Sequence, residues 1–302
     1  MQPSDETVQH QLEVLPEGTE SHYVSLPNRT QMHWFECGSG DPVLLIHGFP
    51  SLPATFASLA GKLARTHRVI MPHLRGYGPT QSEATSIQSF RVEYVSNDLS
   101  QLLLHLDVND VHVVGHDWGA AIAWQLVLQQ AQGRVADLSI LNAILPPRYF
   151  FHRMIMTGQI VRSWYMILFQ IPWFPEWLLR RIGVRGFEAL LRYSTTESTE
   201  ELLSEAALAH KIVLEPDFGG VHYYRAAARR KLPPEQLLRT PAQIIYGLDD
   251  PALGAHLVSP SLTRSWAPHI KLHPLKNVGH WPHLESPNQV HQQLLRFWAE
   301  RT

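Results

Sequence analysis

The chain has 302 residues, of which 44% are hydrophobic and 17% are charged, and its formal net charge at pH 7 is -2. This composition fits a soluble globular enzyme, and the length allows one large domain or a core that carries an inserted domain. Because a basic surplus is missing, the charge argues against a nucleic-acid-binding protein.

The N-terminus and the cysteine content bear on the compartment. Residues 1–6 are polar and acidic, so no secretory signal is predicted, and no run of about 20 apolar residues offers a transmembrane helix. The single cysteine, Cys37, excludes an internal disulfide and fits a reducing compartment. We therefore expect a cytoplasmic protein without a membrane partner.

The eighteen histidines invite a search for a metal site. They are scattered, and neither an HExxH motif nor a two-cysteine metal motif occurs. His280 and His283 lie close in sequence, but Pro282 between them breaks any helix that would present both. We expect neither a metal nor an organic cofactor.

The first half of the chain alternates strands with helices, after a polar surface arm at 1–21. Continuous apolar runs are typical of buried parallel strands, and apolar residues at helical spacing indicate amphipathic helices. Strands are predicted at 22–26, 32–37, 43–46, 68–72 and 138–142, and helices at 56–64 and 90–106.

From about residue 148 to 232 no strand is evident, and the segment is helical, aromatic and rich in arginine. A helical core and a lid over a pocket both fit this composition. A membrane-surface segment is a third interpretation, which Arg153, Arg162 and several prolines weaken because they interrupt the apolar stretch. The α/β pattern then resumes, with strands at 242–247 and 269–272 and helices at 260–266 and 287–300.

This alternation predicts an α/β fold, with a mostly parallel sheet and helices on both faces. The predicted core consists of residues 22–145 and 236–302. Residues 146–235 form an inserted helical lid, or cap, between the two halves.

A Gly-His-Asp-Trp-Gly sequence at 115–119 follows a β-branched run and precedes an alanine-rich stretch. This pattern indicates a strand that turns sharply into a helix, where Gly115 and Gly119 let the two backbones come close. The carboxylate of Asp117, with an ordinary pKa of about 3.9, is ionised at neutral pH and can attack carbon without a base. An ordinary turn with a capping aspartate is the alternative interpretation.

Two more polar residues follow predicted strands further along the chain. Asp250 comes after the strand at 242–247, and His280 lies between the last strand and the last helix. Each alone could be a solvated loop residue. In the order Asp117, Asp250, His280, all after strand ends, they predict a nucleophile, a supporting acid and a histidine base.

Five short motifs connect these positions: HGFP at 47–50, RGYG at 75–78, GHDWG at 115–119, GLDDP at 247–251 and GHW at 279–281. With them the chain resembles α/β-hydrolases of the epoxide hydrolase and haloalkane dehalogenase group, from about residue 22 to its C-terminus. The resemblance implies the α/β-hydrolase fold. It also selects Asp250 over Asp249 as the acid, and Asn142, at the alternative acid position, cannot serve as a carboxylate.

The resemblance extends to the predicted lid. Tyr165, in a Ser-Trp-Tyr segment, and Tyr224, directly before Arg225, match two tyrosines that hydrogen-bond the epoxide oxygen in such epoxide hydrolases. A phenol with a pKa of about 10 can donate to a departing alkoxide while it stays protonated at pH 7. Without the family context, a packing role would be favoured for both.

The remaining site residues are also implied by the resemblance. The backbone N–H groups of Phe49 and Trp118 are expected to hold the oxyanion of the second step. His47, Trp164 and Trp281 are expected to bind the substrate. The implied reaction converts an apolar epoxide and water into a vicinal diol through an alkyl ester on the nucleophile, and the oligomeric state is left open, a homodimer included.

A haloalkane dehalogenase that uses the same triad is the main alternative. Trp118 matches one halide donor, but both activities share it. Phe49 stands where the second common donor is an asparagine, and the helix after the nucleophile has no arginine before Arg134 to bind a substrate carboxylate. A non-catalytic binding protein of the same fold is disfavoured, because such relatives tend to lose triad residues.

Overall fold

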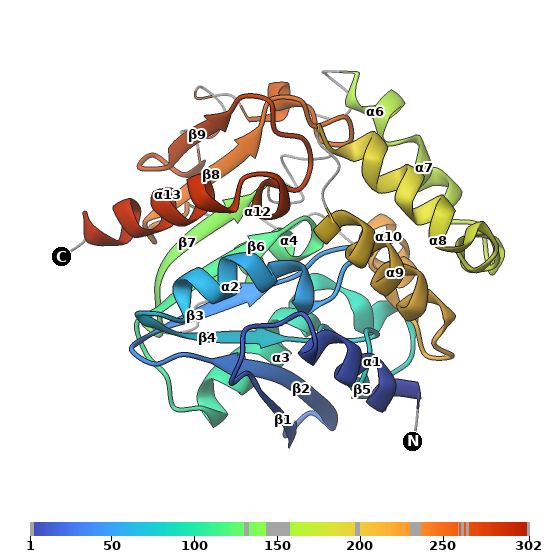
Figure 1. The fold of residues 1–302 in the computed structure, drawn as a ribbon, viewed down its shortest axis with the longest axis horizontal. Coiled ribbons are helices and arrows are strands. Elements are labelled where there is room, and N and C mark those ends of the chain that lie inside the picture. The colour runs from blue at the N-terminus through green and yellow to red at the C-terminus, as the bar shows by residue number, and fades with distance from the viewer. Residues whose placement is uncertain are drawn as a thin grey trace.

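A computed structural model describes residues 3–129, 133–142, 158–196, 200–229, 237–258, 260, 263 and 266–300. Its centre is a nine-stranded sheet in the order β1-β2-β4-β3-β6-β7-β8-β9, with the short β5 paired to β2 (Figure 1). From β4 to β9 along this path the strands are parallel, whereas β1, β2 and β5 pair antiparallel at one edge. The mostly parallel α/β fold predicted from the sequence is confirmed.

The strands begin and end close to where their apolar runs predict. The last one is the exception: it spans Lys271–Leu275, later than the predicted 269–272, because it pairs in register with β8 from Gln243 to Gly247. The bounds are Glu20–Ser25 (β1), Thr30–Cys37 (β2), Asp41–Ile46 (β3), His67–Pro72 (β4), Gln81–Ser82 (β5), Val111–His116 (β6), Val135–Leu141 (β7), Ala242–Gly247 (β8) and Lys271–Leu275 (β9).

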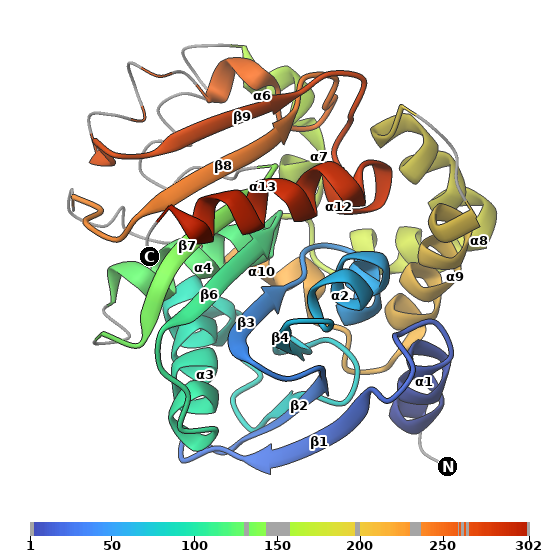
Figure 2. The same ribbon diagram turned by 60° about the vertical axis from the view of Figure 1, so that its left-hand side comes forward.

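Helices cover both faces of the sheet, α2 and α13 on one and α3 and α4 on the other (Figure 2). The predicted helix at 90–106 is confirmed as α3, which begins at Val92 after a 3-10 turn. Most of the predicted helix at 260–266 lies outside the described residues. The bounds are Pro53–Phe56 (η1), Ala57–Leu63 (α2), Ile87–Phe90 (η2), Val92–His105 (α3), Trp118–Leu128 (α4), Ala255–Leu257 (η3), Pro282–Glu285 (α12) and Pro287–Ala299 (α13).

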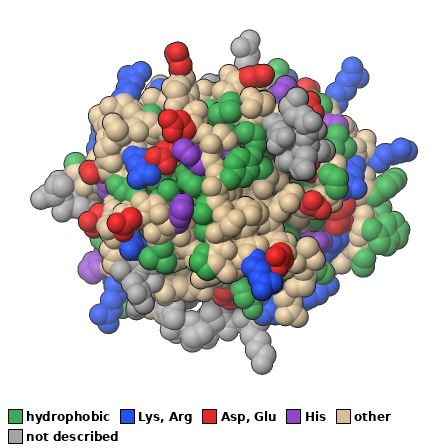
Figure 3. Space-filling model, turned by 90° about the horizontal axis from the view of Figure 1, so that it is seen from below, with side chains coloured by type: hydrophobic (Ala, Val, Ile, Leu, Met, Phe, Trp, Pro, Cys, Tyr) green, Lys and Arg blue, Asp and Glu red, His purple; other side chains and the backbone are tan. Residues whose placement is uncertain are grey.

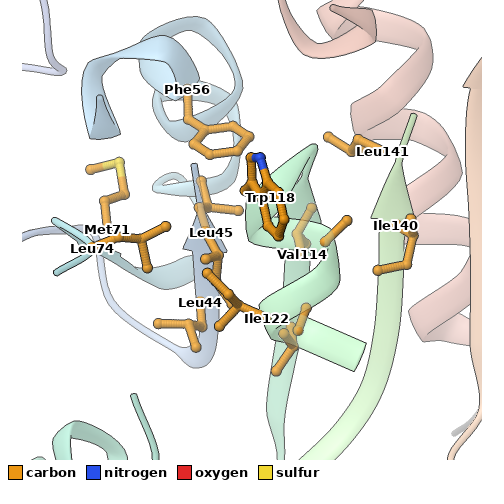
Figure 4. Packing of buried hydrophobic residues seen from close by; sticks show 14 of the residues in the cluster. Leu44, Leu45, Phe56, Met71, Leu74, Val114, Trp118, Ile122, Ile140 and Leu141 are labelled. Carbon is orange, nitrogen blue, oxygen red and sulfur yellow. The ribbon is translucent and has the colours of Figure 1, made fainter. Parts of the chain in front are cut away.

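The hydrophobic core lies between these layers and reaches the start of α4. Strand residues such as Leu45 and Val114 are fully buried, and the Trp118 indole packs near Phe56 and Leu45 (Figure 4). Each fully buried aliphatic side chain of this kind contributes about 1.5–3 kcal/mol to folding. The turn between β6 and α4 therefore packs on the hydrophobic core.

Between β7 and β8 the described residues form helices and no strand, as the sequence predicts. They lie on the side of the sheet where β3 and β6 end (Figure 1). The predicted limits of the insert, 146 and 235, fall outside the described residues. The helices are Gln159–Arg162 (α6), Trp164–Leu168 (α7), Phe174–Ser194 (α8, kinked at Gly183), Glu200–Leu214 (α9) and Gly220–Ala228 (α10).

The N-terminal arm is more structured than the sequence predicts. Residues Pro3–Leu12 form helix α1, because the sparse apolar residues there, such as Val8, are buried against the rest of the protein. Thr7 donates a hydrogen bond over 2.8 Å to Glu215, which follows α9, so α1 joins the core to the insert. None of the described helices is both long enough and apolar enough to cross a bilayer.

Candidate active site

The turn after β6 has the sharp geometry that its glycines predict. Asp117 adopts φ 51° and ψ -117°, a strained conformation for a residue with a side chain, and α4 begins at the next residue. A Cβ atom at Gly119 would lie 2.1 Å from the Ile46 carbonyl oxygen, and one at Gly115 would lie 2.5 Å from the Gly119 carbonyl oxygen. The turn lifts the Asp117 side chain out of the strand and above the sheet.

The structure brings Asp117, Asp250 and His280 together. His280 Nδ1 lies 2.8 Å from Asp250 Oδ2, and His280 Nε2 lies 3.7 Å from Asp117 Oδ2. All three side chains are buried. The histidine therefore stands between the two carboxylates, with one ring nitrogen toward each.

Two backbone N–H groups bind the Asp117 carboxylate. The N–H of Phe49 donates to Oδ1 over 2.8 Å, and the N–H of Trp118 also hydrogen-bonds this carboxylate. These are the two donors that the sequence predicts. Burial raises the pKa of Asp117 above its ordinary value, while His280 and the two N–H groups act in the opposite direction.

Asp250 is held in its ionised form by a full set of donors. Its Oδ1 accepts from the backbone N–H groups of Ala252 (2.7 Å) and Leu253 (2.9 Å), and its Oδ2 accepts from the Asn142 amide (2.7 Å). Although burial alone would raise the pKa of Asp250, the charge of His280 and these hydrogen bonds bring it below the ordinary value.

The pKa of His280 is shifted upward, in the opposite direction to that of Asp250. Burial alone would lower its pKa, but the charge and hydrogen bond of Asp250, followed by the charge of Asp117, raise the pKa of His280 to about 9. The two carboxylates therefore favour the protonated form of His280 in the resting site.

Tyr165 and Tyr224 come from α7 and α10 of the insert and lie close to each other near Asp117. Their rings are 6.0 Å apart, and the Tyr224 ring lies 5.2 Å from Phe49 and 4.9 Å from Trp118. Burial, together with the charge of Asp117, raises the pKa of both phenols above the ordinary value of 10. Both tyrosines are therefore protonated hydrogen-bond donors beside Asp117.

Three residues expected to bind substrate occupy other positions. His47 is fully buried, accepts from the Leu74 N–H through Nε2 and lies 3.1 Å from the Gly48 carbonyl through Nδ1. Its ring thus joins the loops after β3 and β4. Trp164 is 63% exposed, on the outer side of α7. Neither placement supports a direct contact with substrate.

Trp281 is buried next to His280. Its ring lies 5.3 Å from the His280 ring, and its Nε1 donates to the Ser194 hydroxyl over 2.9 Å. This indole anchors the end of α8 to the loop that bears His280. Its position therefore supports the site from outside.

Asn142 has a role that sequence reasoning did not assign. Its amide donates to Asp250 and to the Gly279 carbonyl oxygen, and its own oxygen accepts from the Gly247 N–H over 2.9 Å. The one signal for this role in the sequence is the place of Asn142 directly after a buried strand. In the part of the chain that the structure describes, no three His, Cys, Asp or Glu side chains are grouped to hold a metal ion.

Comparison with known proteins agrees with this geometry. A family model described as the α/β hydrolase fold matches residues 41–287. The chain belongs to the α/β-hydrolase fold family. Among curated relatives, Epoxide hydrolase 3 of Mus musculus is 28% identical over 93% of this chain and 74% of its own length. Epoxide hydrolase 2 of Caenorhabditis elegans is 27% identical over 92% of this chain and 79% of its own length.

Solved structures show the same α/β-hydrolase architecture. The epoxide hydrolase VrEH1 of Vigna radiata superimposes with a TM-score of 0.78 at 23% identity, over 94% of this chain and 99% of its own. An epoxide hydrolase of Bacillus megaterium, solved with an inhibitor, also has a TM-score of 0.78, at 24% identity over 92% of this chain and the whole of its own. The predicted α/β-hydrolase fold and the predicted relationship to epoxide hydrolases are confirmed.

Proposed function

We propose that the protein hydrolyses epoxides to vicinal diols, with Asp117 as the nucleophile. The observation that carries the proposal is the pair of protonated tyrosines beside an ionisable aspartate. Tyr165 and Tyr224 can donate to the oxygen of a strained ring, while Asp117 and His280 supply the nucleophile and the base. The names of the curated relatives support the same activity.

In the first step, Asp117 attacks a ring carbon of the epoxide. Because Oδ1 is bound by the Phe49 N–H, Oδ2 is the oxygen that forms the new bond. The ring C–O bond breaks, and its electron pair stays on the oxygen, which takes a hydrogen bond and then a proton from Tyr165 or Tyr224. The product of this step is an alkyl ester of Asp117.

In the second step, water hydrolyses that ester. The ester has no charge, so one of the charges that raise the pKa of His280 is lost, and His280 gives up its proton more easily. Neutral His280, oriented by Asp250, takes a proton from water, and the hydroxide attacks the ester carbonyl carbon. The N–H groups of Phe49 and Trp118 hold the oxyanion, and the diol leaves with the proton from His280. The second proton of the water molecule is released when the Asp117 carboxyl ionises, and it restores the phenol of the tyrosine that protonated the ring oxygen.

A single turnover of styrene oxide in oxygen-18 water tests the scheme. The diol of the first turnover should contain no label, because its new oxygen comes from Asp117, and the label should then be found in Asp117. Diol formation should be abolished in Asp117→Ala. Labelled diol in the first turnover, or undiminished diol formation by Asp117→Ala, would contradict the proposal.

The same triad could also displace a halide. A halide-release assay with a haloalkane distinguishes this activity, because only a dehalogenase releases halide. Phe49 contributes a phenyl ring beside Tyr224 and no donor side chain, and this arrangement supports the epoxide as the substrate.

A further inference from the structure

The outer side of the insert carries large apolar side chains in contact with solvent. Val161 and Trp173 are about three-quarters exposed, and four other residues of the same stretch are also exposed. Monomeric soluble proteins rarely present a large contiguous apolar surface unless it binds something. We call this surface the insert patch, and it consists of Val161, Trp164, Ile167, Ile171, Trp173 and Trp177.

The insert patch lies directly behind the wall of the active site. In the stretch from 161 to 177, Tyr165 and Phe169 are turned inward, and the Phe169 ring lies 4.8 Å from Tyr224 and 5.5 Å from Phe49. Residues on the other side of the same short helices, such as Trp164 and Ile167, are exposed. One layer of chain therefore separates the patch from the candidate substrate site.

Trp173 combines an exposed side chain with an unusual backbone conformation. This residue adopts φ 56° and ψ -23°, the left-handed conformation that bulky residues avoid, and its side chain is 74% exposed. The conformation costs on the order of 1 kcal/mol, and little packing compensates for it. The geometry presents an indole ring to the surroundings of the protein.

Basic side chains lie beside the insert patch, where the Arg181 guanidinium stands 5.9 Å from the centre of the Trp177 ring. Residues 158–196 contain five arginines and two glutamates, within a chain whose net charge is -2. The arginines are all exposed, whereas both glutamates are half-buried and one of them, Glu176, is paired with Arg225. At the right-hand edge of Figure 3, the side where α8 lies in Figure 1, hydrophobic and basic side chains stand together.

We propose that the insert patch docks the protein on the surface of an anionic lipid bilayer. Tryptophan rings and aliphatic side chains insert at the level of the headgroups, while arginines attract anionic lipid. A second copy of the chain is a poorer partner, because a two-fold interface would set this positively charged face against itself.

The sequence argued against a membrane because Arg162 and the prolines interrupt the apolar stretch. In the structure, Arg162 and Pro172 are exposed beside the patch, and a docking surface needs no continuous helix. If the proposed function holds, docking would bring the site next to the phase in which apolar epoxides concentrate. Docking itself can be measured without any substrate.

Vesicle co-sedimentation tests the proposal. The protein should sediment with vesicles of phosphatidylcholine and phosphatidylglycerol at low salt, and less with phosphatidylcholine alone or at high salt. The double variant Ile167→Gln, Trp173→Asn should lower the partition coefficient at least about tenfold, because two large side chains no longer enter the lipid. Asparagine tolerates positive φ, so the backbone at 173 is preserved.

A matched variant on the opposite side of the molecule provides the control. Tyr94→Gln, Leu104→Gln replaces two exposed apolar residues of α3, and it should sediment like the unmodified protein. Absence of sedimentation with anionic vesicles at low salt, or equal losses in both double variants, would overturn the proposal. The proposal would also be overturned if light scattering showed a dimer of the unmodified protein and a monomer of the Ile167→Gln, Trp173→Asn variant. The patch would then be a self-association surface.

Discussion

Asn142 donates its side-chain amide to Oδ2 of Asp250 over 2.7 Å, the same oxygen that His280 Nδ1 meets at 2.8 Å. The amide also holds the Gly279 carbonyl oxygen, directly before the histidine. One neutral side chain at the end of β7 therefore positions both the acid and the loop of the base. Asn142 itself has φ 44°, which asparagine adopts more easily than most residues.

Replacing that amide by a carboxylate should impair the second half of the reaction. Asn142→Asp keeps the size of the side chain and its tolerance of positive φ, but it removes the donor and sets a negative charge beside Asp250. We expect hydrolysis of the ester to slow on the order of 10- to 100-fold, with little change in ester formation. Rapid-quench single turnovers separate the two rates, and equal losses in both would contradict this role.

The pKa of His280 should depend on the charge of the nucleophile. In Asp117→Asn, which mimics the neutral ester, we expect the pKa of His280 to fall below about 9. Asp250→Asn should lower it further, because Asp250 contributes the larger upward effect. Histidine NMR titration measures both shifts, and an unchanged pKa in Asp117→Asn would show that esterification does not help the base.

The two tyrosines of the insert should act on ring opening alone. Tyr165→Phe and Tyr224→Phe are each expected to slow ester formation on the order of 100-fold, because each removes one donor to the leaving oxygen. Tyr223→Phe is the matched control, since the Tyr223 hydroxyl donates to the Arg75 carbonyl oxygen over 2.8 Å. Single-turnover fluorescence should show a normal ring-opening rate in the control and unaltered ester hydrolysis in all three variants.

Glu205 should make folding stability depend on pH. Burial raises the pKa of this α9 carboxyl from 4.5 to about 8. Between pH 4.5 and 8 the Glu205 carboxyl is ionised in the unfolded chain and protonated in the folded protein. Its contribution to the free energy of unfolding therefore falls as pH rises and is fully present only below pH 4.5. Glu205→Gln should therefore gain stability over the native protein from pH 4.5 to 8, by up to roughly 4 kcal/mol.

Urea unfolding at several pH values measures the difference in free energy of unfolding between Glu205→Gln and the native protein. The effects of the other titrating groups cancel in this difference, because both proteins contain them. A difference between Glu205→Gln and the native protein that stays constant with pH would show that Glu205 titrates normally.

The close approach of Gly119 to the Ile46 backbone, at the turn that bears Asp117, should leave no room for a side chain at position 119. Gly119→Ala would place a Cβ 2.1 Å from the Ile46 carbonyl oxygen, so we expect a loss of about 3 kcal/mol or more and no activity. Gly61→Ala is the control: it lies in α2, where the new Cβ would be 3.6 Å from Pro16. That change should be neutral or stabilise by about 0.5–1 kcal/mol in thermal unfolding, because alanine favours helix.

The insert patch and the positions of His47, Trp164 and Trp281 could not be predicted from the sequence. A tryptophan next to a site tyrosine in sequence points to the opposite side of a helix, so Trp164 is exposed while Tyr165 faces Asp117. His47 stands in a motif beside the oxyanion donor, yet its ring is occupied by two backbone groups. Two residues that are adjacent in sequence can therefore point in different directions, because the packing of loops and short helices sets the direction of each side chain.

Local patterns in the chain are enough to predict the sheet, the turn at Asp117 and the order of Asp117, Asp250 and His280. Apolar runs make buried strands, and glycines on either side of a residue permit a sharp turn. The support of Asp250 by Asn142, the contact of α1 with the insert and the place of Arg181 over the exposed Trp177 become visible only in the folded protein. The first two relationships join residues far apart in the chain, and burial and charge at such contacts arise only when the segments pack together.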